Sequence, residues 1–138
     1  MTPFTEPTGN VVGAGDFRTD GIRAVLNTTR CRACGTAWFP ARTQCAACAS
    51  GDMTPEPSAD TGTVYASTLV RIGPARFSAP YVLTYTDIGD IRVLAHYAGD
   101  SAPAPGTPVQ LRLTVIGSDD NGPVMSYGVA PTTQGANR

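Results

Sequence analysis

All four cysteines of the chain lie in one short stretch, CRACGTAWFPARTQCAAC, which covers residues 31 to 48. They form two C-x2-C pairs, and a gap of ten residues separates the pairs. Thiolates at the first and fourth positions of a tight turn present two sulfurs to one point, and two such turns can face each other as a tetrahedral metal site. We therefore expect all four side chains to bind one metal ion: Cys31, Cys34, Cys45 and Cys48.

Zinc is the metal that we expect, in a structural role, because sulfur fills all four positions and leaves none for water or substrate. A ribbon of this size is too small to bury a stabilising core, so metal binding would supply its folding energy. Iron in a rubredoxin-like site has the same four-sulfur geometry and stays open as an alternative. A pair of redox disulfides ranks below metal, since no thioredoxin-like βαβ pattern accompanies the cysteines.

The residues around the cysteines complete the picture of a ribbon. Gly35 follows the first pair and suits the turn that a metal knuckle needs, whereas Ala49 follows the second pair. Trp38 and Phe39 lie between the pairs. We expect them to cover the metal site and pack on the neighbouring domain rather than to bind a ligand.

After the ribbon the sequence becomes typical of β-strands. Alternating and β-branched residues predict five of them, at 62–72, 80–88, 91–97, 109–116 and 123–129. Gly89 and Asp90 separate the second from the third and indicate a tight hairpin. Between the third and fourth strands, three prolines and two glycines exclude a helix of any length. Five short strands favour a closed barrel of the OB type, because closure removes exposed edges.

The fold class that we expect is mainly β: an N-terminal rubredoxin-like zinc ribbon followed by a five-stranded OB-fold barrel. Composition shifts divide the chain further. A tail rich in Thr, Pro and Gly is expected to be disordered, and a helical turn leading into a strand at 24–30 would precede the first cysteine. The predicted divisions are a disordered tail 1–16, the ribbon with its N-terminal segment 17–53, a linker 54–61, the barrel 62–131 and a disordered tail 132–138.

Charge and hydropathy limit the partners. The formal net charge is −1, and all ten basic residues are Arg. Four thiolates around a dication would make the protein more acidic, which argues against broad nucleic-acid binding. We see no secretory signal and no apolar run long enough for a membrane span, so we expect a cytoplasmic protein.

No motif predicts a self-sufficient active site, and His96, the single histidine, is expected to be a packing residue on its strand. The loop GPARFSAP at 73–80 is more informative because it carries Arg76 beside Phe77. A guanidinium next to an aromatic ring could meet a phosphate or a nucleotide base. A solvated loop without a ligand is an equally good interpretation.

The four-cysteine ribbon, followed by GTVYASTLV, APYVL and RVLAHYAG in that order, resembles the DUF35 family of zinc-ribbon and acyl-CoA-associated OB-fold proteins. The resemblance covers residues 17 to 131. The chain departs from the family pattern at Ala49, where glycine is absent after Cys48, and in its N-terminal segment, which is poor in apolar residues.

The resemblance implies a non-catalytic accessory subunit that associates with a thiolase-fold aldolase, acyltransferase or condensing enzyme in a hetero-oligomer. It also implies that the barrel helps to bind or channel an acyl-CoA substrate shared with that partner. From charge and loop position we expect five residues to contact CoA or the partner: Arg71, Arg76, Phe77, Tyr81 and Arg92.

Three other functions stay open. A single-stranded nucleic-acid binder could stack bases on the barrel tyrosines, although the acidity of the chain counts against it. Rubredoxin-like electron transfer would need iron. An acyl-CoA enzyme acting alone would show turnover without a partner.

Overall fold

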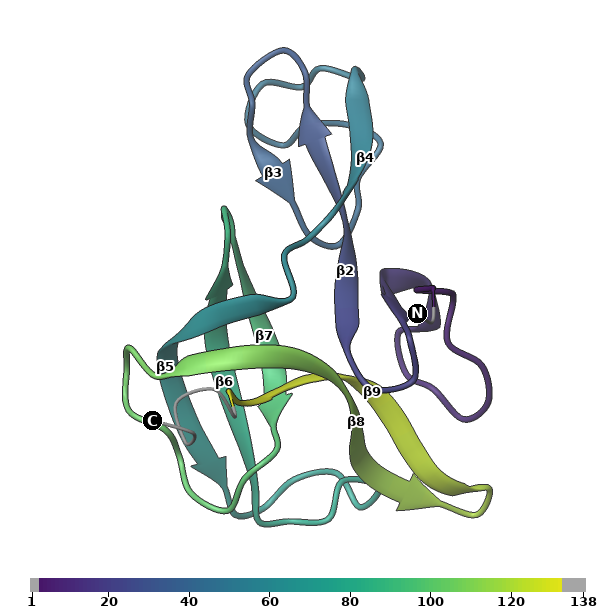
Figure 1. Ribbon diagram of the computed structural model, residues 1–138, viewed down its shortest axis with the longest axis vertical. Helices are drawn as coiled ribbons and strands as arrows, with labels where there is room; N and C mark the ends of the chain where they lie inside the picture. The colour runs from purple at the N-terminus through teal and green to yellow at the C-terminus, as the bar shows by residue number, and fades with distance from the viewer. Residues whose placement is uncertain (1–2, 133–138) are drawn as a thin grey trace.

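The structure, a computed structural model, describes residues 3–132 and has a small ribbon standing on a β-barrel (Figure 1). The elements in chain order are η1 (Ala14–Asp16), β1 (Phe17–Thr19), β2 (Ala24–Cys31), β3 (Ala37–Trp38), β4 (Met53–Pro57), β5 (Thr61–Val70), β6 (Tyr81–Ile88), β7 (Ile91–Tyr97), β8 (Pro108–Asp119) and β9 (Gly122–Pro131). All five strands expected after residue 61 are present, and so is the strand expected at 24–30.

The last five strands close into a barrel in the order β5-β6-β7-β9-β8. Neighbours pair antiparallel except β7 and β9, which meet in parallel at His96 and Tyr97. The turn between β6 and β7 contains Gly89 with φ of 57°, a left-handed conformation that glycine adopts at little cost. No helix forms between β7 and β8 in this described part of the chain. The expected closed five-stranded barrel is confirmed.

One hydrophobic core runs through the barrel and into the N-terminal strands. Phe17 of β1 and Leu26 of β2 are fully buried, and both belong to the cluster that contains the barrel residues Val64, Leu111 and Val129. These two side chains, which come from outside the barrel, therefore contribute to its core. Ribbon and barrel are therefore joined by a common core.

The expected linker at 54–61 is wrong, because it contains β4. This strand pairs antiparallel with β2, from Asn27↔Pro57 to Cys31↔Met53. Ser58 continues the pairing by donating its N–H to the Leu26 carbonyl. In this register the backbone nitrogens of Pro55 and Pro57 point away from β2, so the prolines remove no ladder hydrogen bond.

The N-terminal segment also differs from the expected disordered tail. Over residues 3–16 it runs beside β1 and β9, with isolated bridges from Thr5 to Thr19 and from Val11 to Met125. The Val12 N–H donates to the Met125 carbonyl at 2.9 Å. The helical turn expected within 16–30 does not form: β1 and β2 occupy most of this segment, and the 3-10 turn η1 lies just before it. Residues 1–2 and 133–138, the rest of the two expected tails, lie outside the described residues.

The shared core leads to a prediction on cooperativity. Phe17→Ala is expected to lower the free energy of unfolding by about 3–5 kcal/mol, because it removes a fully buried ring and leaves a cavity. Chemical denaturation should be followed both by far-UV circular dichroism, which reports mainly the barrel, and by fluorescence of Trp38, the single tryptophan, which lies in the ribbon. Both transitions should shift together.

Ile22→Ala is the matched control, since Ile22 is 60% exposed, and it should change stability by less than about 0.5 kcal/mol. A Trp38 transition that stays in place while the barrel transition moves would contradict the common core.

Candidate metal centre and barrel pocket

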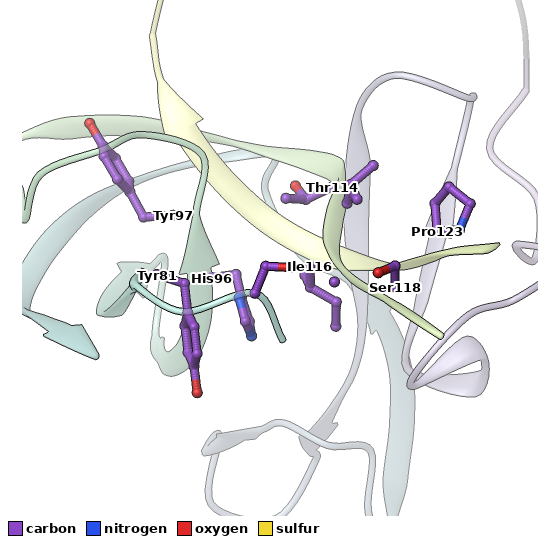
Figure 2. Close-up of a pocket in the computed structure, with 10 residues that line it drawn as sticks. Tyr81, His96, Tyr97, Thr114, Ile116, Ser118 and Pro123 are labelled. Carbon is purple, nitrogen blue, oxygen red and sulfur yellow. The ribbon is translucent and has the colours of Figure 1, made fainter. Parts of the chain in front are cut away.

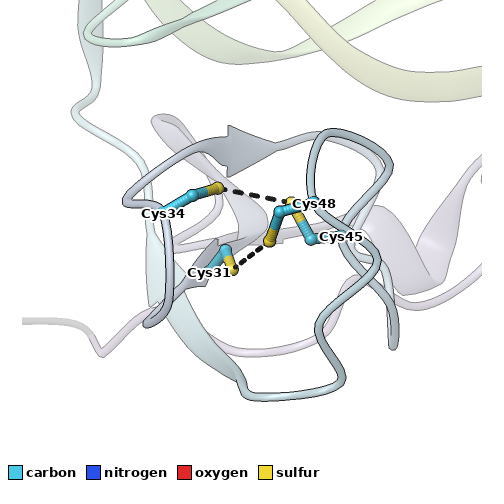
Figure 3. Close-up of side chains that lie close together, drawn as sticks. All are labelled: Cys31, Cys34, Cys45 and Cys48. Atoms are coloured by element: carbon cyan, nitrogen blue, oxygen red, sulfur yellow. Dashed lines mark hydrogen bonds between the residues drawn. The ribbon is translucent and has the colours of Figure 1, made fainter.

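The two cysteine pairs form two turns with the same backbone geometry. In the first turn, the Gly35 N–H donates to the Cys31 carbonyl at 2.8 Å. In the second, the Ala49 N–H donates to the Cys45 carbonyl at the same distance. The ribbon therefore presents two matching knuckles, and their four side chains converge (Figure 3).

Ala49 occupies in the second knuckle the place that Gly35 has in the first. Its φ is 68°, against 82° for Gly35, so both residues have the left-handed conformation. An L-residue pays for this conformation with a close contact between its Cβ and the backbone, a cost of roughly 1 kcal/mol that glycine avoids. The second knuckle therefore forms with Ala49 in a strained backbone conformation.

The four sulfur atoms lie within 4.8 Å of one another. Cys31 and Cys48 are 3.6 Å apart at Sγ, as are Cys34 and Cys45. Metal–sulfur bonds of about 2.3 Å in a tetrahedron place the sulfurs about 3.8 Å apart, which matches these distances. Cys31 and Cys45 are buried while Cys34 and Cys48 are exposed, so the cluster lies at the surface of the ribbon. The four cysteines are arranged to hold a metal ion.

Hydrogen bonds favour the thiolate form at two of the sulfurs. Burial raises the pKa of the Cys45 thiol, but donors outweigh it, chiefly the Cys48 N–H and the Trp38 indole N–H at 3.4 Å, and lower that pKa to about 6. The Thr36 hydroxyl, 3.2 Å from the Cys34 sulfur, lowers the pKa of Cys34. Both shifts favour the thiolate, which is the form that binds a metal.

Cys48 is held in the opposite state. The Ser50 N–H lowers the pKa of Cys48, but the adjacent Cys31 sulfur, burial and the other two sulfurs raise it to about 12. Four thiolates in so small a volume repel one another unless a cation compensates them. A bound cation would compensate this repulsion.

Trp38 and Phe39 face in two directions. Trp38 lies over the cluster through its bond to Cys45, and the Arg42 guanidinium lies 5.6 Å from the centroid of its ring. Phe39 packs edge-on against Tyr127 of β9, with ring centroids 5.7 Å apart. One of these two sequence neighbours therefore contacts a sulfur of the cluster and the other contacts the barrel.

Arg30 ties the ribbon to the barrel. Its guanidinium pairs with Glu56 of β4 at 2.9 Å and with Asp90, in the β6–β7 turn, at 3.0 Å. It also donates to the Gly35 carbonyl at 2.8 Å. The Arg30 side chain therefore connects the first knuckle, β4 and the β6–β7 turn.

The five residues expected to contact CoA or the partner fall into two groups. Phe77 and Tyr81 pack edge-on with centroids 5.8 Å apart, and the Arg76 guanidinium lies 5.8 Å from the Phe77 centroid. Arg71 is exposed at the start of the same loop, directly after β5. These four residues share one end of the barrel.

Arg92, near the start of β7, lies beside the opposite end of β6 from Tyr81. It pairs with Asp87 through bonds of 2.6 and 3.1 Å and lies over the Tyr65 ring, 3.5 Å from its centroid. Six residues of extended strand, about 20 Å, separate Asp87 from Tyr81. The structure therefore does not bring Arg92 together with the other four.

His96, expected from the sequence only to pack on its strand, lies beside Phe77 and Tyr81. Its ring stacks on Tyr81 at 5.1 Å with an interplanar angle of 19°, and it meets Phe77 edge-on at 5.1 Å. Burial lowers the pKa of His96, which favours the neutral imidazole. The two-residue turn predicts that Leu83 pairs with His96, as observed, so counting back from Gly89 could have placed the ring beside Tyr81.

Tyr81 and His96 line a cavity of about 390 Å³ at this end of the barrel (Figure 2). The other lining residues are Ser78, Tyr97, Thr114, Val115, Ile116, Gly117, Ser118 and Pro123. The Arg76 carbonyl accepts a 2.8 Å bond from the Ser118 N–H, and a Cβ at Gly117 would lie 1.8 Å from that oxygen. Glycine at 117 therefore lets the 73–80 loop pack directly against β8.

A larger cavity, of about 690 Å³, has no counterpart in the sequence analysis. It lies between the N-terminal segment, β1, β2 and β4, and its lining includes Phe4, Arg18 and Glu56. The hydroxyls of Thr28 and Thr29 in its wall already bond to the backbone of Glu56 and Arg42. No sequence signal could reveal it, because it exists only where the N-terminal segment folds back.

A four-cysteine ribbon that shares its core with a closed five-stranded barrel defines a protein of the ribbon-plus-OB-fold class. No protein-family model matches the chain. It is 30% identical over 115 residues to the benzoylsuccinyl-CoA thiolase subunit BbsA of Thauera aromatica, covering 78% of this chain and 77% of that protein.

The fold is also similar to a solved structure named the Ltp2-ChsH2(DUF35) aldolase, with a TM-score of 0.60 and 26% identity. The match covers 78% of this chain and 84% of the chain in that structure. The chain belongs to the DUF35 family, which confirms the resemblance found in the sequence. Among residues 3–132 the structure has no helix that is long and apolar enough to cross a membrane.

The strained knuckle gives a test of the metal centre. Ala49→Gly is expected to stabilise the ribbon by up to about 1 kcal/mol, because relief of the left-handed strain exceeds the added flexibility of the unfolded chain. The measurement is the rate at which a chelator removes the bound metal, followed by Trp38 fluorescence, and release should be slower than in the wild type.

Ala47→Gly is the control in the same turn. Ala47 is not among the described residues with positive φ, so glycine there adds only flexibility and should speed metal release. Equal effects of the two variants would contradict the assignment of strain to Ala49.

Proposed function

We propose that the chain is a non-catalytic, zinc-binding accessory subunit that associates with a thiolase-fold enzyme, an aldolase, acyltransferase or condensing enzyme, and helps to bind or channel its acyl-CoA substrate. The observation that carries this proposal is the relationship to a thiolase subunit over most of both chains. The likeness to an aldolase structure with a DUF35 component adds support. Cysteines that hold a metal rather than forming disulfides suit a reducing compartment, so a cytoplasmic location is part of the proposal.

Zinc is the proposed ion because the four sulfurs suit a closed structural site. Its bound form would compensate the charge of the four thiolates and fix the two knuckles. This chain's own residues then supply the remainder: Trp38 and Thr36 donate hydrogen bonds to sulfur, and the ribbon becomes a rigid extension of β2.

The end of the barrel that carries Arg76 is the proposed acyl-CoA contact. Guanidinium groups form strong charge-assisted bonds with phosphates, and Arg71 and Arg76 are both exposed at the loop. A flat pair such as Tyr81 and His96, beside a cavity, can stack with an adenine ring. His96 has a lowered pKa and is packed between rings, which suits a binding surface better than a general base.

The first test is reconstitution. The chain should be co-expressed with candidate thiolase-like proteins from the same genome, and any complex should be purified and assayed for acyl-CoA turnover. We expect co-purification in a defined ratio, about one zinc per chain, and activity that needs both proteins. A red protein containing iron would contradict zinc, and turnover by the isolated chain would contradict the accessory role.

The second test concerns the acyl-CoA contact. Arg76→Ala in the complex is expected to weaken acyl-CoA binding about tenfold, the loss of one charge-assisted hydrogen bond to phosphate. It should be measured as KM or by calorimetry. Arg18→Ala is the control, since Arg18 is an exposed arginine on β1 beside the larger cavity. A loss with Arg18→Ala and none with Arg76→Ala would contradict the proposed contact.

A further inference from the structure

The outer face of β6 and β7 carries few charged groups for an exposed sheet surface. Alternate residues of a barrel strand face outward, where polar side chains are expected. On β6 these are Tyr81, Leu83, Tyr85 and Asp87, and on β7 they are Arg92, Leu94 and His96. Only the two residues nearest the hairpin are charged. Both faces of these strands are therefore largely apolar, although the inner face alone is enough to build the barrel core.

Four outward side chains form a continuous apolar surface, which we name the tyrosine face: Tyr65, Leu83, Tyr85 and Leu94. Tyr85 and Leu94 lie directly opposite each other in the β6–β7 ladder. On β5, Ala66 is the ladder partner of Tyr85. Tyr65, the residue before Ala66, lies in the β-bulge between Val64 and Ala66. Tyr65, Tyr85 and Leu94 are each about half exposed, at 53%, 50% and 50%. Three large side chains on adjacent strands thus remain in contact with water.

The edge of the tyrosine face is already ordered. The Arg92 guanidinium lies flat over Tyr65, 3.5 Å from the centroid, while two bonds to Asp87 fix its orientation. A side chain held in this way loses little rotamer freedom on binding. Tyrosine and arginine are also the residue types that carry most of the binding energy in protein interfaces. The composition and the order of this face are those of an interface centre.

The size of the surface indicates the kind of occupant. Three strands about 4.8 Å apart and six residues at about 3.4 Å each give a face on the order of 300 Å². A stable protein interface needs about 800 Å² from each partner. The contact must therefore extend beyond the strands, and the adjacent loop offers Ile72, which is 92% exposed. A folded protein can cover both, whereas a small ligand cannot.

The tyrosine face is continuous with the proposed acyl-CoA contact. Leu83 pairs with His96 across the ladder, and His96 lines the cavity near Arg76. A protein docked on the face would therefore lie beside the open side of that cavity. This arrangement suits an acyl-CoA held between two subunits.

We propose that the tyrosine face is the docking surface for the thiolase-like subunit, which covers Tyr65, Tyr85 and Leu94 with an apolar surface of its own and closes the cavity lined by Tyr81 and His96. This inference rests on the proposed function, because it assumes that such a partner exists. It adds the face through which the partner binds.

The test uses the complex obtained by reconstitution. Tyr85→Ser and Leu94→Ser are expected to raise the Kd for the purified thiolase-like subunit at least tenfold. Ile22→Ser is the matched control, because Ile22 is equally aliphatic and 60% exposed but lies outside the face, and its Kd should stay within twofold of wild type. Tyr85→Phe keeps the ring and should bind as the wild type does. Unchanged Tm values will verify that each variant is folded.

Each outcome decides the proposal. A complex that forms equally well with Tyr85→Ser and Leu94→Ser overturns the tyrosine face and leaves the proposed function intact. A wild-type chain that binds no thiolase-like subunit overturns the proposed function and this inference with it. If the wild-type chain alone dimerises and Leu94→Ser makes it monomeric, the occupant is a second copy and the inference is wrong.

Discussion

Strand β2 is the constraint on which both modules depend. Leu26, near its start, lies in the barrel core, and Cys31, its last residue, is the first ligand of the cluster. Five residues of extended chain, about 17 Å, span the distance between them. Because a paired strand is stiff, the position of the cysteine cluster follows from the packing of Leu26 and Phe17. The ribbon is thus fixed to the barrel through buried apolar contacts, and Arg30 adds a polar contact to the same junction.

Much of this architecture could be predicted from local patterns, and the parts that could not depend on distant contacts. The barrel strands follow from alternation, and the metal ligands follow from cysteine spacing. Strand β4 was not predicted, because Pro55 and Pro57 are typical of a linker. Only the register with β2 reveals that their backbone nitrogens face outward. The ordered N-terminal segment depends on bonds to Met125, more than a hundred residues away. His96 was assigned a packing role because its neighbours Phe77 and Tyr81 come from another strand and a loop.

The core of the barrel is completed by residues of the N-terminal strands, and no helix lies in the described segment between β7 and β8. The segment between β7 and β8 is too rich in proline and glycine to supply one, and β1 and β2 bring aromatic and aliphatic groups to the core instead. Tyr127 joins these parts, since Phe17 and Phe39 both pack edge-on against its ring at 5.7 Å. The same contact that closes the barrel therefore receives the ribbon. The contact of both Phe17 and Phe39 with Tyr127 helps to keep the small ribbon in a defined orientation.

The prolines of β4 have a consequence for the chain in a crowded cell. No strand pairs with the outer edge of β4 among residues 3–132, and Pro55 and Pro57 carry no N–H at two of the positions that face outward. An unrelated polypeptide that tried to add a strand there would find no donors at either position. The two prolines thereby make this border a poor template for the addition of a further strand.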